Sequence, residues 1–156
     1  MKLGKQNIFS IAKYITKKYN INSSIKLQKL MYFSYIYFYK KTGLLLFDEK
    51  FEAWVYGPVL REIYYHTRDY GLFFNYFPSS EIKFRDNKIV EIKTSKKIIP
   101  DLKNETVCKL IDEALIDYSK LSAMLLVAEA HKSEYWIKAR NGLDISLPSD
   151  RDIIIN

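Results

Sequence analysis

Apolar side chains recur at helical spacing at the start of the chain. From Asn7 onward they stand three or four residues apart, with lysines between them, which predicts an amphipathic helix. A polar break follows, in which Ser23 or Ser24 is suited to cap the next helix. Residues 25–41 are predicted to form that second helix, which ends before Gly43.

The second predicted helix is apolar on nearly every face. Leu27, Leu30 and Met31 lie on one side of it, while Tyr32 and Tyr35 lie on others. A helix of this kind is either buried at the centre of a domain or shares a face with a partner.

The stretch FEAWVYGPV at 51–59 contains the one Gly-Pro pair, Gly57-Pro58. Proline suits the first turn of a helix, because its missing N–H would have no partner there. The sequence therefore predicts a helix that begins at Pro58 and ends at Gly71. Residues before a proline favour extended geometry, so 51–56 is predicted to cross the surface as a short extended strip.

Apolar and polar residues alternate at 81–93 around Asp86-Asn87, a pair typical of a two-residue hairpin turn. Helical spacing then returns. It predicts helices that begin at Asn104, that cover 121–130 with Ser122 as a cap, and that cover 133–140. The end of the chain, 153–155, suits either a terminal strand or a docking segment.

These elements predict a mainly α fold: a single compact helical domain over 1–156, of about five to seven helices, with a small inserted β-hairpin at about 78–100. No apolar run approaches the roughly 18 residues of a membrane span, and the start lacks the apolar core of a signal peptide. The single cysteine, Cys108, fits a reducing compartment. We therefore expect a cytoplasmic protein without membrane contact.

The formal charge of +7 suggests an anionic partner. However, 20 of the 25 basic residues are lysines, which is typical of a solvated surface. The charge is uneven, because residues 1–50 hold ten lysines against two acids. Such asymmetry allows a basic face on the N-terminal third.

Residues that carry catalysis or bind metals are scattered. His66, His131 and Cys108 show no metal-ligand spacing, and no glycine-rich phosphate loop or nucleophile elbow is present. A Cys108–His131 nucleophile pair is conceivable, but a cysteine in the middle of a predicted helix favours an inert buried thiol. The sequence predicts neither an enzyme, nor a metal site, nor a cofactor.

Three segments in order resemble the Panacea domain, the family of antitoxin-associated, phage-associated and SocA-like proteins. The first is KLQKLMYF at 26–33, the second is EAWVYGPV at 52–59, and the third is a leucine-serine start at 121–122 followed by a histidine and a tryptophan. The resemblance covers about 8–140. Its matching residues, which we expect to be structural, include Leu27, Gln28, Lys29, Leu30, Tyr32, Phe33, Gly57, Pro58, His131 and Trp136.

The resemblance implies a mostly helical antitoxin that lacks a catalytic site and neutralises a cognate toxin by direct binding. We expect the adjacent gene to encode that toxin. Protein interfaces are enriched in aromatic residues, and the chain has 13 Tyr, 9 Phe and 2 Trp. Tyrosine tolerates water before a partner binds. The candidate partner-binding residues are therefore Glu52, Trp54, Tyr56, Tyr35 and Tyr39, with the hairpin insert as a second candidate surface.

Other functions stay open at this stage. Helices with a hairpin and a lysine-rich N-terminal third also suit a nucleic-acid-binding transcriptional regulator, although base reading favours Arg, Asn or Gln on an exposed helix. A protein that delivers the toxin to a protease, as a proteolytic adaptor, would have the same features. An unrecognised hydrolase is a third class. Homo- or hetero-oligomers are compatible with all of these.

Overall fold

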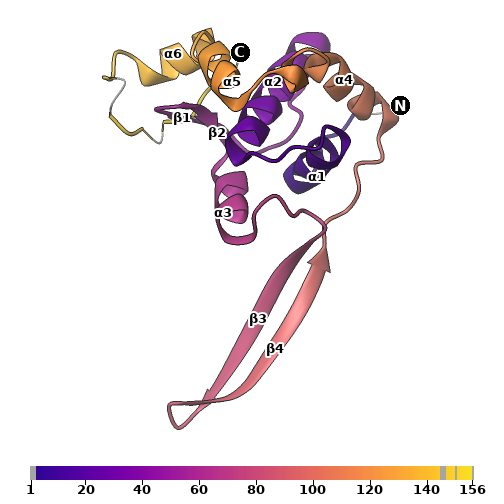
Figure 1. Cartoon of the computed structure of the whole chain (residues 1–156), viewed down its shortest axis with the longest axis vertical. Helices are drawn as coiled ribbons and strands as arrows, with labels where there is room; N and C mark the ends of the chain where they lie inside the picture. Colours follow the sequence, from indigo (N-terminus) through magenta and orange to yellow (C-terminus); the bar gives the residue numbers. More distant parts are fainter. Residues whose placement is uncertain (1–2, 145–146, 150, 156) are drawn as a thin grey trace.

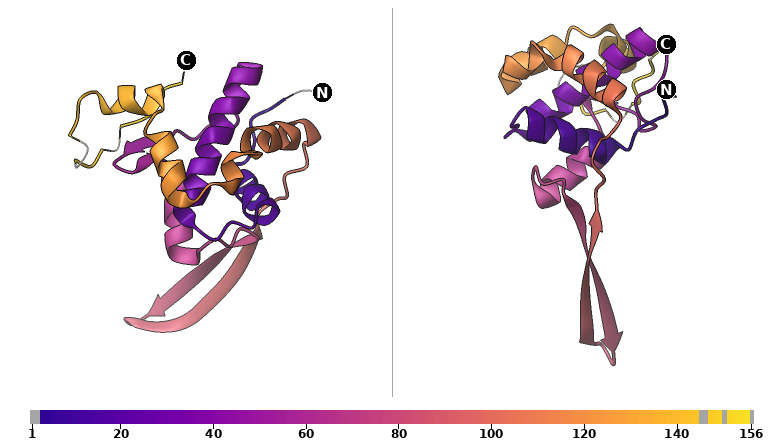
Figure 2. Two further views of the ribbon diagram at one scale, coloured as in Figure 1. Left: turned by 45° about the horizontal axis from the view of Figure 1, so that its top comes forward. Right: turned by 90° about the vertical axis from the view of Figure 1, so that its right-hand side faces the viewer.

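The chain folds into a helical body from which a long β-hairpin projects (Figures 1 and 2). The structure is a computed structural model that describes residues 3–144, 147–149 and 151–155, without the side chains of 78–80. Its elements in order are α1 (Ile8–Lys18), α2 (Ser24–Thr42), β1 (Glu52–Trp54), β2 (Gly57–Val59), α3 (Arg61–Tyr70), β3 (Tyr76–Arg85), β4 (Lys88–Ile98), α4 (Glu105–Leu115), the 3-10 turn η1 (Tyr118–Lys120), α5 (Ala123–Ala130) and α6 (Glu134–Arg140).

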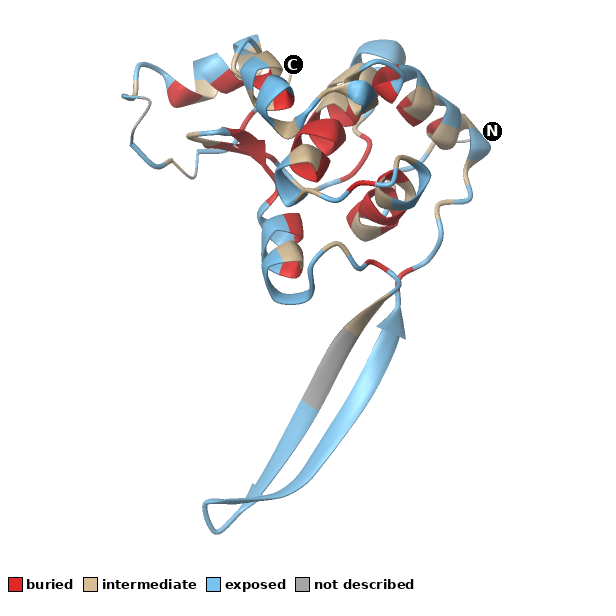
Figure 3. Ribbon diagram, in the orientation of Figure 1, coloured by how far each residue is buried: buried red, intermediate tan, exposed pale blue. Residues whose placement is uncertain are grey.

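Helix α2 is the centre of the body. It packs against α1, α3, α4, α5 and β2, and Figure 3 shows buried residues along it. Leu27, Leu30, Met31 and Phe38 are at most 1% exposed. Tyr32 and Tyr35, which lie off that face, are also buried, so the apolar residues around this helix reflect a central position in the fold.

The prediction of a mainly α fold is wrong, because the fold is mixed α/β. The insert is a hairpin with strands of 10 and 11 residues, and a second hairpin forms from β1 and β2. The alternation of apolar and polar residues is readable only at 81–93. Outside that range most strand residues are polar and do not alternate with apolar ones. The sequence therefore contains no pattern from which the full length of the strands could be predicted.

The predicted turn at Asp86-Asn87 is confirmed. Both residues have positive φ, 52° and 61°, as a type I′ turn requires, and Arg85 pairs with Lys88 across it. We call β3, β4 and this turn the arm. Every side chain from 81 to 98 is exposed, and Figure 3 shows the arm extending away from the body.

The base of the arm is attached to the body by aromatic and polar contacts. The Phe77 ring packs edge-on against Phe9, with ring centroids 4.6 Å apart, and His66 stacks on Phe74 at 4.5 Å. Nζ of Lys13 donates to the carbonyl of Ile99 at 2.9 Å. These contacts fix where the arm leaves the body.

Pro58 does not begin a helix as predicted. It lies in β2 and pairs with Ala53, and α3 begins at Arg61. An edge strand tolerates a residue that lacks a backbone N–H. The predicted strip 51–56 is extended only at β1, and Val55 and Tyr56 form the two-residue turn between the strands. We call β1, β2 and this turn the 52–59 hairpin.

The side chain of Gln28 determines where the 52–59 hairpin ends. Oε1 of Gln28 accepts from the backbone N–H of Leu60 at 2.8 Å, and Nε2 donates to the carbonyl of Leu60 at 3.0 Å. Both residues are buried. Leu60 is the N-cap of α3 and makes no side-chain cap of its own, so Gln28 binds both backbone groups at the junction.

The C-terminal segment adds to the free side of β1. The N–H of Ala53 donates to the carbonyl of Arg151 at 2.8 Å, the N–H of Ile153 donates to the carbonyl of Phe51 at 2.7 Å, and Glu52 bridges Asp152. The chain end thus pairs with β1 through an isolated β-bridge at Asp152, and no strand forms at 153–155. No helix in the described ranges has the length and apolar character to cross a membrane.

We predict that Gln28→Leu destabilises the protein by about 1–3 kcal/mol, because it leaves the buried N–H of Leu60 unpaired, while the carbonyl of Leu60 still accepts from the N–H of Tyr64. The melting temperature should fall by roughly 2–12 °C for a chain of this size. Gln6→Leu is the matched control, since Gln6 is only partly buried and donates to Gly4 nearby in the chain. Equal melting temperatures for the two variants would contradict the role of Gln28.

Candidate functional site

Side chains from the C-terminal helices hold the 52–59 hairpin by its backbone carbonyls. Nε2 of His131 donates to Val55 at 3.0 Å, and Nε1 of Trp136 donates to Trp54 at 2.9 Å. The His131 and Trp136 rings stack, with centroids 4.6 Å apart. His131 and Trp136, which we expect to be structural, thus contact the backbone of the 52–59 hairpin and each other.

Arg140 completes this set of contacts from the end of α6. Its guanidinium is buried and donates to the carbonyl of Ala53 at 3.1 Å, and also to the carbonyls of Asp144 and Leu147 at 2.8 and 2.6 Å. Three backbone carbonyls compensate the burial of this charge. The same side chain thus joins β1 to the segment after α6.

Lys29 approaches the 52–59 hairpin from α2. The residue is 2% exposed, and its Nζ donates to the carbonyl of Pro58 at 3.0 Å. Burial lowers the pKa of Lys29 from 10.5 to about 8, because a charged ammonium is poorly solvated there. Within the described ranges no carboxylate forms an ion pair with it.

Gly57 makes room for this lysine. Its φ is +111°, and a Cβ at this position would lie 2.9 Å from Cε of Lys29 and 3.3 Å from Cβ of Ala130. A side chain at residue 57 is therefore excluded by both the backbone conformation and the space. Gly57, which we expect to be structural, thus allows the side chain of Lys29 to pack against the backbone of the 52–59 hairpin.

Glu52 lies at the start of the 52–59 hairpin, with Arg61 and Trp54 as partners. Nε and Nη2 of Arg61 each donate to one carboxylate oxygen of Glu52 at 2.9 Å, and Nε1 of Trp54 lies 3.4 Å from Oε1. Glu52 is 5% exposed. A bidentate pair of this kind fixes the orientation of both side chains.

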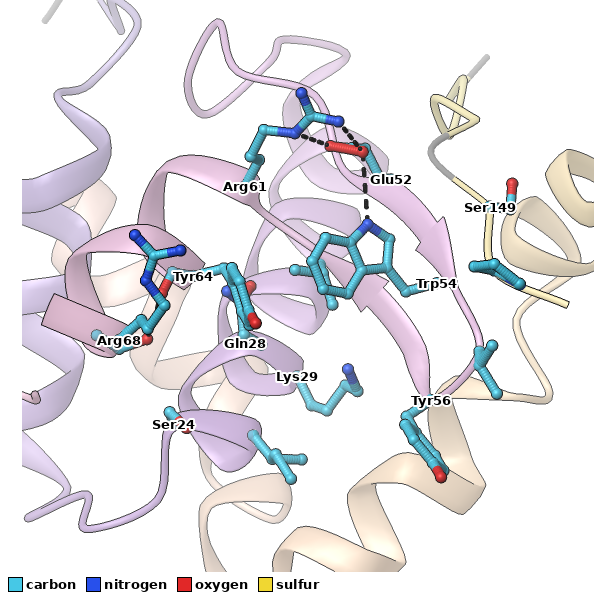
Figure 4. Close-up of a pocket in the computed structure, with 15 residues that line it drawn as sticks. Ser24, Gln28, Lys29, Glu52, Trp54, Tyr56, Arg61, Tyr64, Arg68 and Ser149 are labelled. Atoms are coloured by element: carbon cyan, nitrogen blue, oxygen red, sulfur yellow. Dashed lines mark hydrogen bonds and ion pairs between the residues drawn. The ribbon is translucent and has the colours of Figure 1, made fainter. Parts of the chain in front are cut away.

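A pocket of about 870 Å³ lies between this hairpin and the start of α2 and α3. Figure 4 shows its lining. The residues that line it come from α2, the 52–59 hairpin, α3 and the C-terminal segment: Ser24, Ile25, Gln28, Lys29, Glu52, Trp54, Val55, Tyr56, Val59, Arg61, Tyr64, Thr67, Arg68, Pro148 and Ser149.

Three of the five predicted partner-binding residues line the pocket, and the other two do not. Glu52, Trp54 and Tyr56 all line the pocket, and Tyr56 is 70% exposed. Tyr35 is 5% exposed and packs against Phe47 and Phe51 in the core, so it offers no surface to a partner. Tyr39 is partly buried on α2 and does not line the pocket.

The remaining motif residues of α2 are placed in or beside the core. Leu27 and Leu30 are fully buried. The hydroxyl of Tyr32 lies 2.5 Å from Oγ of Ser133, which joins α2 to the start of α6. Phe33 stacks on Tyr118 at 4.1 Å. These positions are consistent with the expected structural role.

Arg61, Tyr64, Arg68 and Arg140 were not predicted from the sequence. The Tyr64 ring contacts Trp54 at 4.9 Å, and Arg68 pairs with Asp69 at the pocket rim. Tyr64 and Arg68 stand four residues apart on α3, so helical spacing could have placed them on one face. The contact of Arg140 with the carbonyl of Ala53 spans 87 residues, and no local pattern indicates it.

Several lysines of the N-terminal third are used inside the protein. Besides Lys29, Lys13 forms an ion pair with Asp101 at 2.7 Å, and Nζ of Lys26 donates to the carbonyl of Ser119 at 2.7 Å. These contacts tie α1 and α2 to segments more than 80 residues away. Part of the positive charge of this third is therefore used in contacts within the protein.

Cys108 and His131, considered above as a nucleophile pair, lie against different backbone carbonyls. Sγ of Cys108 lies 3.8 Å from the carbonyl of Leu102, and burial raises the pKa of its thiol. His131 instead binds the carbonyl of Val55. In the part of the chain that the structure describes, no group of His, Cys, Asp or Glu could hold a metal ion.

Residues 27–137 match the family model described as "Antitoxin SocA-like, Panacea domain". The chain belongs to this family. No curated protein and no solved structure matches the chain. In this Panacea-domain protein, the matched range includes the 52–59 hairpin, α3, and Gln28 and Lys29 of α2, while the lining residues Ser24, Ile25, Pro148 and Ser149 lie outside it.

We predict that Gly57→Ala destabilises the protein by about 3–5 kcal/mol, through backbone strain and contact with Lys29. Gly43→Ala is the control. Gly43 also has a positive φ, of 71°, but no atom lies within 4 Å of a Cβ there, so only strain of about 1–2 kcal/mol is expected. Chemical denaturation measures both values, and equal losses would contradict close packing at Gly57.

Proposed function

We propose that this protein is an antitoxin that neutralises a cognate toxin by direct binding, and that the pocket face is its principal contact surface. Membership of the Panacea family carries the antitoxin part of the proposal. The location of the surface is supported by the pocket, where the 52–59 hairpin presents Trp54 and Tyr56.

The chemistry of this face suits a protein partner. Tyr56 and Ile25 are 70% and 50% exposed, and Tyr64 is 39% exposed. Arg61 and Arg68 add guanidinium groups beside these apolar side chains. Aromatic residues and arginine are the types that dominate the centres of protein interfaces, and concave sites accept the anchoring side chains of a partner.

The arm is a second candidate contact surface. Ile82 pairs with Ile92, and Phe84 pairs with Ile89. Paired residues, and residues two apart on a strand, share a face, so these four side chains form one apolar face, and each is 48–65% exposed. Lys83, Glu91 and Lys93 form ion pairs on the other face. An uncovered apolar face on a two-stranded hairpin favours a partner.

The proposal is tested by expressing the product of the neighbouring gene alone and together with this protein. We expect growth arrest in the first case, rescue in the second, and co-purification of the two proteins. A harmless neighbour, or rescue without any association between the two, would contradict neutralisation by direct binding.

We predict that Tyr56→Ala weakens toxin binding by about tenfold or more, as expected for an aromatic anchor, and leaves the melting temperature unchanged because the side chain is exposed. Trp54→Ala should weaken binding similarly. Calorimetry on the purified pair measures both. Met124→Ala is the control, since Met124 is 79% exposed on α5 and lies outside the pocket. Wild-type affinity for Tyr56→Ala would exclude Tyr56 as an anchor.

We predict that exchanging 81–93 between two members of the family transfers part of their preference between toxins. The arm side chains are exposed, so the exchange should not alter the folding of the body. Growth rescue in all four combinations of chimaera and toxin measures the preference. If each chimaera keeps the preference of its body, the arm does not determine specificity.

A further inference from the structure

Lys29 has hydrogen-bonding capacity that the described residues leave unused. An ammonium group has three N–H donors, and the acceptor identified for Lys29 is the carbonyl of Pro58. Buried charges in proteins are ordinarily paired with an opposite charge or bind several polar groups. Arg140, by contrast, reaches three carbonyls with its buried guanidinium. Lys29 is therefore undercompensated where it lines the pocket.

The pocket around Lys29 has a positive balance of charge and an apolar wall. Lys29, Arg61 and Arg68 are its cationic lining residues, and Glu52 is its one carboxylate in the described lining. Glu52 pairs with Arg61, and no ion pair joins it to Lys29 among the described residues. A ligand that complements this pocket carries a negative charge next to an apolar body.

We propose that the pocket binds a segment of the partner protein in which an aspartate or glutamate follows an aromatic or aliphatic side chain. The carboxylate would accept from Nζ of Lys29, and the apolar side chain would lie against Trp54 and Tyr64. Figure 4 shows Lys29 and these rings around the same space. This inference rests on the proposed function, and it specifies the chemistry of the toxin segment.

A carboxylate side chain fits better than the other anionic groups. A phosphate carries more charge and more acceptor oxygens than Lys29 can satisfy, and the other cations of the lining, Arg61 and Arg68, are exposed and already paired with Glu52 and Asp69. A chain-terminal carboxylate is usually captured by a nest of backbone N–H groups. The pocket instead offers side-chain donors, and among its cationic lining residues Lys29 is buried while Arg61 and Arg68 are exposed.

The test uses two acetylated and amidated dipeptides, Phe-Glu and Phe-Gln, which differ only in the charge of the second side chain. Protein carrying ¹³C-labelled lysine reports on the Cε resonance of Lys29, which is assigned by its loss in Lys29→Met. We expect Phe-Glu to shift this resonance saturably at millimolar concentration and to raise the pKa of Lys29 toward its ordinary value, and Phe-Gln to bind at least about tenfold more weakly. Inorganic phosphate should cause no comparable shift.

Lys29→Met also serves as a binding control. Methionine has a similar unbranched length and no charge to desolvate, but it leaves the buried carbonyl of Pro58 without this donor, so binding is measured well below the melting temperature of the variant. We expect it to lose the preference for Phe-Glu over Phe-Gln. Equal binding of the two peptides to the wild type, an unchanged preference in Lys29→Met, a comparable shift with phosphate, or no saturable binding at all would each overturn the proposal.

The peptide measurement tests the chemistry of the pocket, and the toxin measurement tests the proposed function, so a negative result in one does not imply a negative result in the other. The dipeptides contain no toxin, so they decide the chemistry of the pocket even if the neighbouring gene product proves harmless. Conversely, if the toxin co-purifies with wild type and Lys29→Met with equal affinity, the protein remains an antitoxin and Lys29 does not bind the partner.

Discussion

The structure depends on side chains that bind the backbone of residues 53–60. Gln28 and Lys29 from α2 bind Leu60 and Pro58, while His131, Trp136 and Arg140 bind Val55, Trp54 and Ala53. A two-stranded hairpin has little stability of its own. These hydrogen bonds and the packing around them fix its position between the central helix and the C-terminal helices.

The same contacts produce the pocket. Side chains of α2 and the C-terminal helices bind the backbone carbonyls of the 52–59 hairpin. The side chains of Trp54 and Tyr56 therefore remain available to line the pocket. A rigid support of this kind lowers the entropic cost of binding a partner. The cost of the arrangement is a buried ammonium at Lys29 with a single acceptor in the described structure, and that cost makes a carboxylate-bearing partner favourable.

Local chemistry could be predicted from the sequence, whereas the long-range contacts could not. Ser23 and Ser122 cap helices as predicted, and Asn7 and Asn104, where helices were predicted to begin, are also N-caps, because each cap depends only on residues two or three positions away. Pro58 was misassigned because a proline suits a helix start and an edge strand equally well, and Gln28, 32 residues from Leu60, decides between them. Glu52, Trp54 and Tyr56 were predicted together because they are adjacent, while Arg61 and Arg68 join them only in the folded chain.

Hydrogen exchange of the protein with and without its toxin tests the central account most directly. We expect the toxin to slow exchange at 24–29 and 52–68, which form the pocket walls, with any further protection at the arm. Protection confined to α4 and η1, on segments that do not line the pocket, would contradict the assignment of the binding surface.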